Sequence, residues 1–279
     1  MPDAADKLQF DRSMFKTNIE EEVLFANMES ATRRQLPQAQ PWETQDRPII
    51  LLAGGPSLAN FEAEIIERRK NGEPVVTVNG THDWLLDRGC KPSMHLMLDG
   101  RPMNTKFVQR PVPECKYYIA SQCHPEVFDA LEGYDVTLWH GLFSDCEEKR
   151  MLEKYYFGQW FPIIGGCTVV LRGIMLLRLL GFENIELYGF DSCLMRDDTN
   201  DSWHHHAYKQ TENDKNEIIS IKVEGKEFLC ATWMYSQALD FIEMSKSVAQ
   251  HVNLIVHGDG LISYIIRTGC KKLEKFNSD

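Results

Sequence analysis

The clearest pattern in the chain begins near residue 47, where short apolar runs alternate with segments whose apolar residues recur every three or four positions. Short apolar, β-branched runs favour buried strands, and the three-to-four spacing favours helices packed on one side. The pattern predicts strands at 49–53, 75–78, 95–99, 117–120, 136–140, 185–188 and 253–257, and helices at 58–69, 82–88, 125–131, 166–180 and 232–250. Because strands and helices alternate, we predict an α/β fold with a Rossmann-like, mostly parallel sheet and helices on both faces.

Two segments depart from this alternation. Residues 1–45 are predicted to form a short helical N-terminal extension, because helical spacing between 19 and 28 precedes a proline-bounded break. We expect the extension to pack on the main domain, residues 46–279, or on a second subunit, which would make the protein a homo-oligomer. The stretch 191–226 is polar and is expected to form a long loop or a small hairpin.

The first predicted strand runs directly into Gly54, Gly55, Pro56 and Ser57, and a helical pattern follows. Such a turn is a common anion site, because glycine can adopt positive φ and the unpaired first-turn N–H groups point at the ligand. Pro56 suits the first helical turn because it has no N–H to leave unused. The same residues fit a tight strand-to-helix turn without a ligand. Neither a GxGxxG fingerprint nor a Walker A loop is present.

Three more predicted strands end in polar or glycine residues, namely Asn79 and Gly80, then Asp99 and Arg101, then Asp191. Open α/β sheets bind ligands outside the carboxyl ends of their strands, so we expect a ligand here. Asp99 and Asp191 are candidate catalytic residues and candidate Mg²⁺ ligands, although an aspartate at such a position also fits a turn or helix cap. Arg101 would grip a phosphate or pair with Asp99.

A second glycine turn, Gly165, Gly166, Cys167 and Thr168, stands at the start of a predicted helix. Its first-turn N–H groups would make another anion cradle. Alternatively, the glycines serve only to bring the helix close to the sheet.

Three consecutive histidines stand at 204–206, inside the polar stretch. They lack the HExxH spacing of a zinc site, and a solvated loop accounts for them. Alternatively, His206 would fold over the ligand and transfer a proton, because histidine titrates near neutral pH.

Composition narrows the choice of partners. The formal charge of −11 and the pI near 5.3 give no overall field that would attract a polyanion, so we do not expect general nucleic-acid binding. No apolar stretch reaches the roughly 20 residues of a membrane span, and residues 1–10 lack a signal-peptide layout, so we expect a cytoplasmic protein. The eight cysteines include no CxxC and are expected to be reduced.

In their order along the chain, these motifs resemble the family of 6-hydroxymethylpterin diphosphokinase MptE-like proteins, which also takes in motility-associated sugar-transfer factors. The likeness spans roughly residues 47–266. It rests on GGPSL at 54–58, GCKPS at 89–93 leading to Asp99, GGCTV at 165–169, LGFENI at 180–185 leading to GFD at 189–191, and VEGK at 223–226 leading into the last long helix.

The resemblance implies a Rossmann-like domain that binds a nucleotide at the Gly-Pro-Ser turn. In diphosphokinase members, ATP gives its pyrophosphoryl group to a pterin alcohol with Mg²⁺ present, which would make Asp99 and Asp191 metal-site residues. The same stretches are similar to bacterial sialyltransferases. Asn79 and Gly166 of this chain match residues that hold a cytidine sugar nucleotide in those enzymes. The histidine base of those enzymes is missing, because the matching stretch reads CATW at 230–233.

We therefore predict a Mg²⁺-dependent diphosphokinase that transfers pyrophosphate from ATP to a pterin-like alcohol. The alternatives are a glycosyltransferase using a nucleotide-activated sugar and a non-catalytic binding protein. Both enzyme hypotheses imply a small-molecule nucleotide as ligand, either ATP or a CMP or UDP sugar. Contacts to the acceptor would come from 103–113 and 192–217, which match no known motif.

Overall fold

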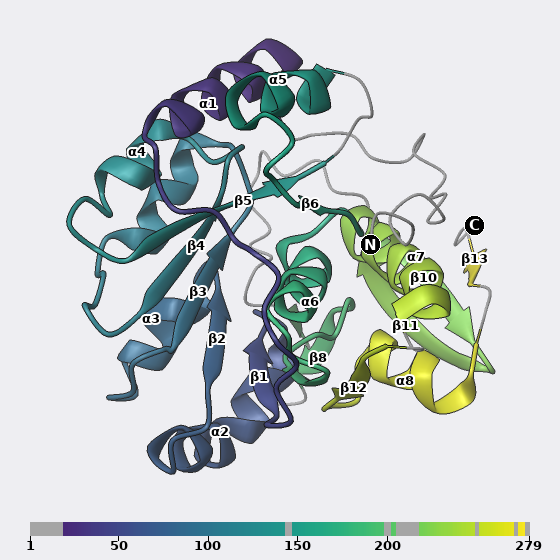
Figure 1. Cartoon of the computed structure of the whole chain (residues 1–279). Coiled ribbons are helices and arrows are strands. Elements are labelled where there is room, and N and C mark those ends of the chain that lie inside the picture. Colours follow the sequence, from purple (N-terminus) through teal and green to yellow (C-terminus); the bar gives the residue numbers. More distant parts are fainter. Residues whose placement is uncertain are drawn as a thin grey trace.

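The fold is a parallel β-sheet layered between helices, as Figure 1 shows. The computed structural model describes residues 19–142, 147–197, 202–204, 218–248, 251–270 and 273–276. Eight strands form the large sheet, and each pair of neighbours runs parallel. The predicted α/β, Rossmann-like architecture is therefore confirmed.

The strands of the large sheet, in spatial order, are β12 (Asn253–Val256), β7 (Asn184–Tyr188), β1 (Ile49–Leu52), β2 (Val75–Val78), β3 (Met94–Met97), β4 (Lys116–Ala120), β5 (Val136–Gly141) and β6 (Pro162–Ile163). Smaller sheets join β11 (Lys226–Ala231), β10 (Ile218–Val223) and β13 (Glu274–Phe276), and β8 (Met195–Asp197) with β9 (Ser202–His204). The α-helices are α1 (Glu21–Arg33), α2 (Glu62–Lys70), α3 (Thr81–Leu86), α4 (Pro125–Asp129), α5 (Glu147–Tyr156), α6 (Val169–Leu179), α7 (Thr232–Val248) and α8 (Leu261–Thr268). Two 3-10 helices are η3 (Pro56–Phe61) and η4 (Pro102–Val108).

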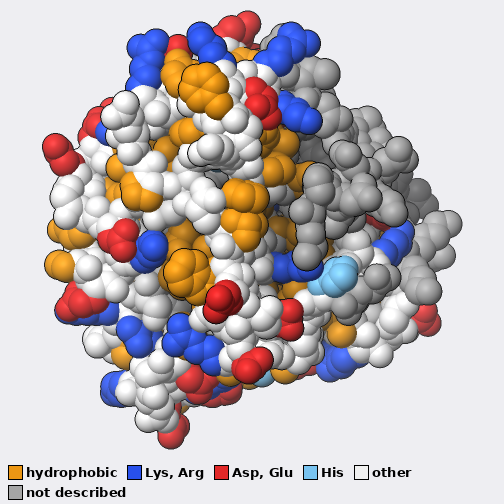
Figure 2. Space-filling model, in the orientation of Figure 1, with side chains coloured by type: hydrophobic (Ala, Val, Ile, Leu, Met, Phe, Trp, Pro, Cys, Tyr) orange, Lys and Arg blue, Asp and Glu red, His pale blue; other side chains and the backbone are white. Residues whose placement is uncertain are grey.

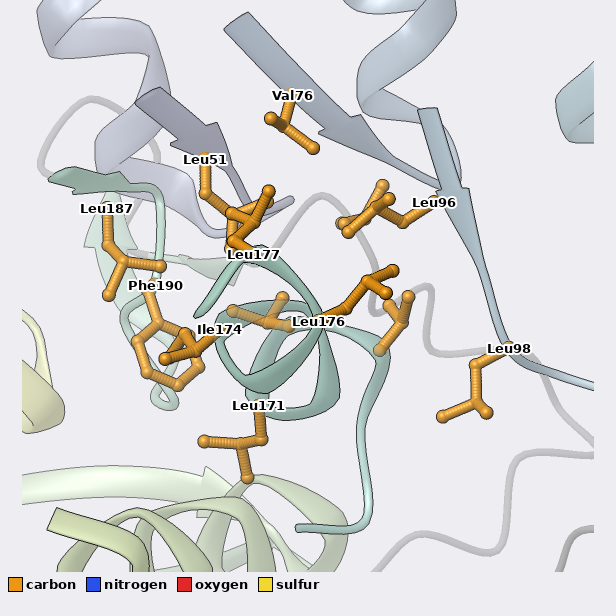
Figure 3. Packing of buried hydrophobic residues seen from close by; sticks show 14 of the residues in the cluster. Leu51, Val76, Leu96, Leu98, Leu171, Ile174, Leu176, Leu177, Leu187 and Phe190 are labelled. Atoms are coloured by element: carbon orange, nitrogen blue, oxygen red, sulfur yellow. The ribbon is translucent and has the colours of Figure 1, made fainter. Parts of the chain in front are cut away.

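Helices cover both faces of the sheet, which explains why every residue of β1 and β2 is buried. On one face, Ile50 and Leu52 of β1 pack in a cluster with residues of α2 and α3. On the other face lies α6, whose residues belong to the main core. In Figure 3, Leu177 of α6 reaches toward Leu51, whereas Leu171 points away from the sheet. A helix that is apolar on opposite sides in this way is buried between two layers.

Every strand predicted from an apolar run is present, with its ends displaced by at most two residues. The helix predicted at 58–69 begins differently, because its first turns are the 3-10 helix η3 and α2 follows only at Glu62. The predicted helix 166–180 is shorter and corresponds to α6. Helices α5 and α8 were not predicted.

The polar stretch 191–226 contains the hairpin of β8 and β9, which was one of the two predicted alternatives. A second hairpin, β10 and β11, was missed. Its signal was a period-two alternation, because Ile219, Ile221 and Val223 are buried whereas Lys222 between them is exposed. The turn residues that follow, 224–225, have φ of 46° and 82°, as a type I′ hairpin turn requires.

The described part of the N-terminal segment packs on the main domain. Asn27 of α1 donates from Nδ2 to the carbonyl oxygens of Gly100 and Gln122, at 3.1 and 3.0 Å, beyond the ends of β3 and β4. After α1 the chain runs beside β5, where the N–H of Ala39 donates to a carbonyl of that strand at 2.7 Å. Figure 1 shows α1 and α5 together at one end of the sheet, and apolar residues of both helices form one cluster.

The face seen in Figure 2 carries basic and acidic side chains interspersed with apolar ones, with no broad area of a single charge. In the part of the chain that the structure describes, no helix is long and apolar enough to cross a bilayer. The cysteines of that part form no disulfide with one another.

A cluster of charges fastens α2 to the sheet. Arg68 of α2 donates to the two carboxylate oxygens of Glu186 of β7, at 2.7 and 2.8 Å, and to Glu73 at 2.6 Å. His257, which follows β12, lies 2.9 Å from the same Glu186 carboxylate. The hydrogen bonds from Arg68 lower the pKa of Glu186 to about 2, because they stabilise its ionised form.

We predict that Glu186→Gln removes an acid-sensitive part of the stability. A carboxyl whose folded pKa is lowered stabilises the protein above its unfolded pKa, and this contribution is lost as pH falls from about 4.5 toward 2. Because the Glu186 side chain is only 15% exposed, solvent screens its interactions little. We expect the free energy of unfolding of the variant to fall by on the order of 2 kcal/mol at pH 7 and by almost nothing near pH 2. Urea unfolding at several pH values measures this difference. The exposed Glu67→Gln on α2 is the control, and equal pH slopes for the two variants would contradict the assignment.

Candidate functional site

Four predicted strand ends meet at one edge of the sheet. Strands β7, β1, β2 and β3 are consecutive neighbours and run parallel, so the residues after them emerge side by side. Residues 189–191 follow β7, 54–57 follow β1, 79–80 follow β2, and 99–101 begin one residue beyond β3. The predicted adjacency of these segments is confirmed.

The first glycine turn is tight for a different reason from the one expected. Neither glycine uses the positive φ that it can adopt, since Gly55 has φ of −77° and Gly54 is not among the positive-φ glycines. Instead, a Cβ on Gly55 would lie 2.3 Å from the carbonyl oxygen of Gly189 and 2.4 Å from Oδ2 of Asp191. Glycine is required at 55 because the end of β7 approaches the backbone too closely for a side chain.

Asp191 lies inside this turn and caps η3. Its side chain is 2% exposed, and the N–H of Ser57 donates to its Oδ2 at 2.9 Å. Burial raises the pKa of the Asp191 carboxyl, and the hydrogen bond from Ser57 partly offsets that rise. The protein's own carboxylate therefore occupies one of the N–H groups that the sequence offered to a ligand anion.

A third strand end completes the enclosure of Asp191, and it was not singled out from the sequence. A Cβ on Gly258 would lie 2.7 Å from Oγ of Ser57, and a Cβ on Gly260 would lie 2.5 Å from Cα of Asp191. Both glycines follow β12, which is the neighbour of β7. The signal was available, because Gly-Asp-Gly directly follows the predicted strand 253–257.

The second glycine turn is also closed by a carboxylate. Gly165 and Gly166 have φ of 133° and 50°, so here positive φ does favour glycine. The N–H of Cys167 donates to Oδ2 of Asp240 at 2.8 Å. Burial raises the pKa of Asp240 and also that of the Cys167 thiol. Asp240 comes from α7, so no local sequence pattern marked it as a partner of this turn.

Side chains from two helices fix the start of α6. Thr168 is its N-cap residue, and its Oγ1 accepts a hydrogen bond from Nε2 of Gln237 at 2.7 Å. Arg172 is 2% exposed and donates to the carbonyl oxygens of Gly166 and Ile163, at 3.1 and 2.8 Å. Burial lowers the pKa of Arg172 to about 10, so it stays protonated at neutral pH. These contacts support the packing alternative for the second turn.

Asp99 and Arg101 pair with each other. The Nε of Arg101 lies 3.0 Å from both carboxylate oxygens, and its backbone N–H donates to Oδ1 at 3.0 Å. Asp191 stands three strands away, roughly 14 Å at the usual strand spacing. The structure therefore brings the two predicted metal ligands to one edge but does not bring them together. In the described ranges, no three His, Cys, Asp or Glu side chains are grouped to hold a metal ion.

Unpartnered polar atoms follow three neighbouring strands. Asn79 Oδ1, Asn104 Nδ2 and Gln122 Oε1 are buried and have no hydrogen-bond partner, and they follow β2, β3 and β4 in that order. Buried polar atoms in proteins nearly always have partners, so this row of atoms, which we call the polar row, marks a place for a ligand or ordered water. Asn104 and Gln122 were not predicted individually, although 103–113 was expected to contact an acceptor.

The remaining candidates differ in what the structure says of them. Gly80 is exposed at the start of α3, and Asn79 before it has φ of 48°, which is uncommon outside glycine. Pro56 takes the first position of η3, as predicted. His206, the candidate proton acceptor, lies outside the described residues.

We predict that Gly55→Ala destabilises the protein by about 1–3 kcal/mol, because the new methyl group must displace the end of β7. Gly80→Ala is the matched control, since its Cβ would meet Phe107 at an ordinary 3.4 Å and should cost far less. Denaturant unfolding of both variants measures the difference. Similar losses in the two variants would show that the contact with Gly189 does not constrain the turn.

Comparisons with known proteins agree with this geometry. The family model described as 6-hydroxymethylpterin diphosphokinase MptE-like matches residues 22–197, more than half of the chain. A solved structure, the MAf glycosyltransferase from Magnetospirillum magneticum AMB-1, has a similar fold, with a TM-score of 0.59 and 16% identity over 85% of this chain. The match covers 37% of that protein, so the chain spans well under half of its length. No curated protein sequence matches. The chain belongs to the 6-hydroxymethylpterin diphosphokinase MptE-like family, a membership that supports a transferase-type function.

Proposed function

We propose that the protein is a transferase that binds a nucleotide-activated sugar across the carboxyl ends of β2 to β4. The observation that carries this proposal is the polar row, which lies where open α/β sheets bind their ligands. Each atom of the row gains a partner if a ligand with hydroxyl and amide groups lies along this edge. Such pairing would stabilise the complex, because a buried polar group without a partner costs about 1–3 kcal/mol.

The charges at this edge favour a sugar nucleotide over a polyphosphate. All three atoms of the polar row belong to uncharged amide side chains, which suit sugar hydroxyls because amides can both donate and accept. One N–H in each glycine turn already donates to a buried aspartate, Asp191 or Asp240. The Arg101 guanidinium is paired with Asp99. A donor with few phosphate charges therefore meets less repulsion here than ATP does.

The proposed catalytic contribution of the described residues is positioning. Asn79 and Gln122 would accept hydrogen bonds through their amide oxygens, and Asn104 would donate a hydrogen bond from Nδ2. Together they would hold the sugar nucleotide in one orientation over the strand ends. Fixing a donor next to its acceptor converts an encounter in solution into a local step, which is a large source of rate enhancement. We propose His206 as the proton acceptor for the attacking hydroxyl.

The second candidate function is pyrophosphoryl transfer from ATP to a pterin-like alcohol, and the description of the family model favours it. Its Mg²⁺ would stabilise charge that develops on the phosphates. Asp99 and Asp191 do not fit a shared resident site for this ion, because they stand three strands apart and each already accepts hydrogen bonds from the protein. In this case the ion would be expected to arrive with the nucleotide.

We predict that Asn79→Gly weakens nucleotide-sugar binding roughly three- to tenfold, the loss expected for one hydrogen bond. Glycine tolerates φ of 48°, so the change removes the amide without straining the backbone. Gln35→Gly is the matched control, because Gln35 is exposed and also has positive φ, 54°. Calorimetric titration with CMP, UDP, their sugar conjugates and ATP, each with Mg²⁺ and with chelator, measures the affinities.

The panel separates the candidate functions. Binding of a CMP or UDP sugar that Asn79→Gly weakens and Gln35→Gly leaves intact supports the proposal. ATP binding that requires Mg²⁺ and exceeds that of every sugar nucleotide would replace it with the diphosphokinase. A panel without saturable binding would support the non-catalytic alternative.

A further inference from the structure

A groove of about 710 Å³ lies on the surface between the segment after α1 and the end of α5, beside β5. Its lining residues are Gln38, Gln40, Tyr155, Tyr156, Phe157, Gly158, Gln159 and Phe161. The volume lies within the range of about 300–1,000 Å³ that is usual for small-molecule sites. The candidate site described above includes none of these residues.

The lining has an unusual chemical composition. Among the described residues, it combines four aromatic rings and three glutamine amides with no Lys, Arg, Asp, Glu or His. Aromatic faces attract apolar C–H surface, and amides both donate and accept hydrogen bonds. A charged ligand would find no counter-charge here. The lining therefore favours an uncharged molecule with apolar faces and many hydroxyl groups.

Two polar groups of the groove are available for such a molecule. The hydroxyl of Tyr156 is buried without a hydrogen-bond partner, and burial raises its pKa to about 12, so it stays protonated at neutral pH. Gln38 Oε1 lies 3.0 Å from Nε2 of His140. Burial lowers the pKa of His140 to about 3, so this imidazole is neutral and its Nε2 can reach Gln38 only as the N–H donor. Within the described residues, the Gln38 amide hydrogens donate to no protein group, so they can donate to a ligand.

Phe157 is the least expected residue of the groove. Its side chain is 85% exposed, and its φ of 50° is a left-handed conformation in which glycine or asparagine is preferred. A non-glycine residue pays roughly 1 kcal/mol or more for this conformation. An exposed aromatic ring held in a strained conformation at a groove is a reason to ask what it binds.

From the groove, the geometry points to a binding site for a neutral saccharide. The C–H faces of a sugar ring would lie on the aromatic rings of Tyr155, Phe157 or Phe161, and its hydroxyl groups would pair with Tyr156 and with the glutamine amides. A flat heterocycle also stacks on aromatic rings, but it offers fewer hydroxyl partners to three amides and a phenol. The inference goes beyond the proposed function and does not require it. If both hold, the saccharide is the acceptor.

The test uses the full chain and four neutral disaccharides: cellobiose, maltose, lactose and N,N′-diacetylchitobiose. Saturation-transfer difference NMR detects binding, and titration gives the affinity. We expect at least one disaccharide to bind. Tyr156→Phe should weaken its affinity roughly three- to tenfold, and Phe157→Asn should weaken it at least as much. Trp42→Ala is the matched control, because Trp42 is 70% exposed and does not line the groove. It should leave binding unchanged.

Phe157→Asn also guards against a folding artefact. Asparagine tolerates left-handed φ better than phenylalanine, so the variant should unfold at the same temperature as the wild type or above it. Its affinity for sugar nucleotides or ATP should match the wild type, which keeps this test separate from that of the polar row. The inference is overturned if no disaccharide binds, if the two groove variants bind as well as the wild type, or if adenine binds in the groove and the disaccharides do not.

Discussion

The hydrogen bond from the Ser57 N–H to the buried Asp191 carboxylate is the constraint around which this end of the sheet is built. For a carboxylate to reach that N–H, the ends of β1, β7 and β12 must approach one another without side chains between them. Gly55 and Gly258 provide that space. The helix start is therefore fixed from within the protein. The first turns of this helix are 3-10, and its cap residue, Gly55, is extended with a negative φ. The turn closes over the internal carboxylate of Asp191.

The same arrangement recurs at the start of α6, where Asp240 accepts from the Cys167 N–H. The two helix starts that the sequence marks as anion cradles thus both carry internal carboxylates. Because burial raises the pKa of both aspartates, each carboxyl is costly to ionise, and a phosphate placed beside it would raise that cost. Under the proposed function, this electrostatic condition would direct ligand recognition away from the turns and toward the uncharged polar row. Recognition would then depend on hydrogen-bond geometry more than on charge.

The sheet could be predicted well because each buried parallel strand is marked by its own sequence, a short, mostly apolar run. Strands β1 and β2 are examples, and all of their residues are buried. The sequence also located the site edge, since the residue after each strand is fixed by topology once the sheet is parallel. Prediction from the sequence failed for contacts between residues that are far apart in the chain. Gly55 is required by Gly189, and the Cys167 turn is closed by Asp240 of α7. No local pattern encodes those contacts, and the polar row appears only once each side chain is seen to lack a partner.

The groove and the polar row are joined by buried hydrogen bonds at the ends of β4 and β5. His140 of β5 lies 3.0 Å from Gln38, which lines the groove, and 3.1 Å from Oγ of Ser121, which follows β4. The next residue, Gln122, donates to the carbonyl of Gly141 and keeps its Oε1 free for the polar row. Because His140 is neutral above about pH 3, this connection does not titrate in the physiological range. If the polar row binds the sugar donor and the groove binds the acceptor, as proposed, two adjacent strand ends would hold them in a fixed relation, which is what a transferase needs to present an acceptor to a donor.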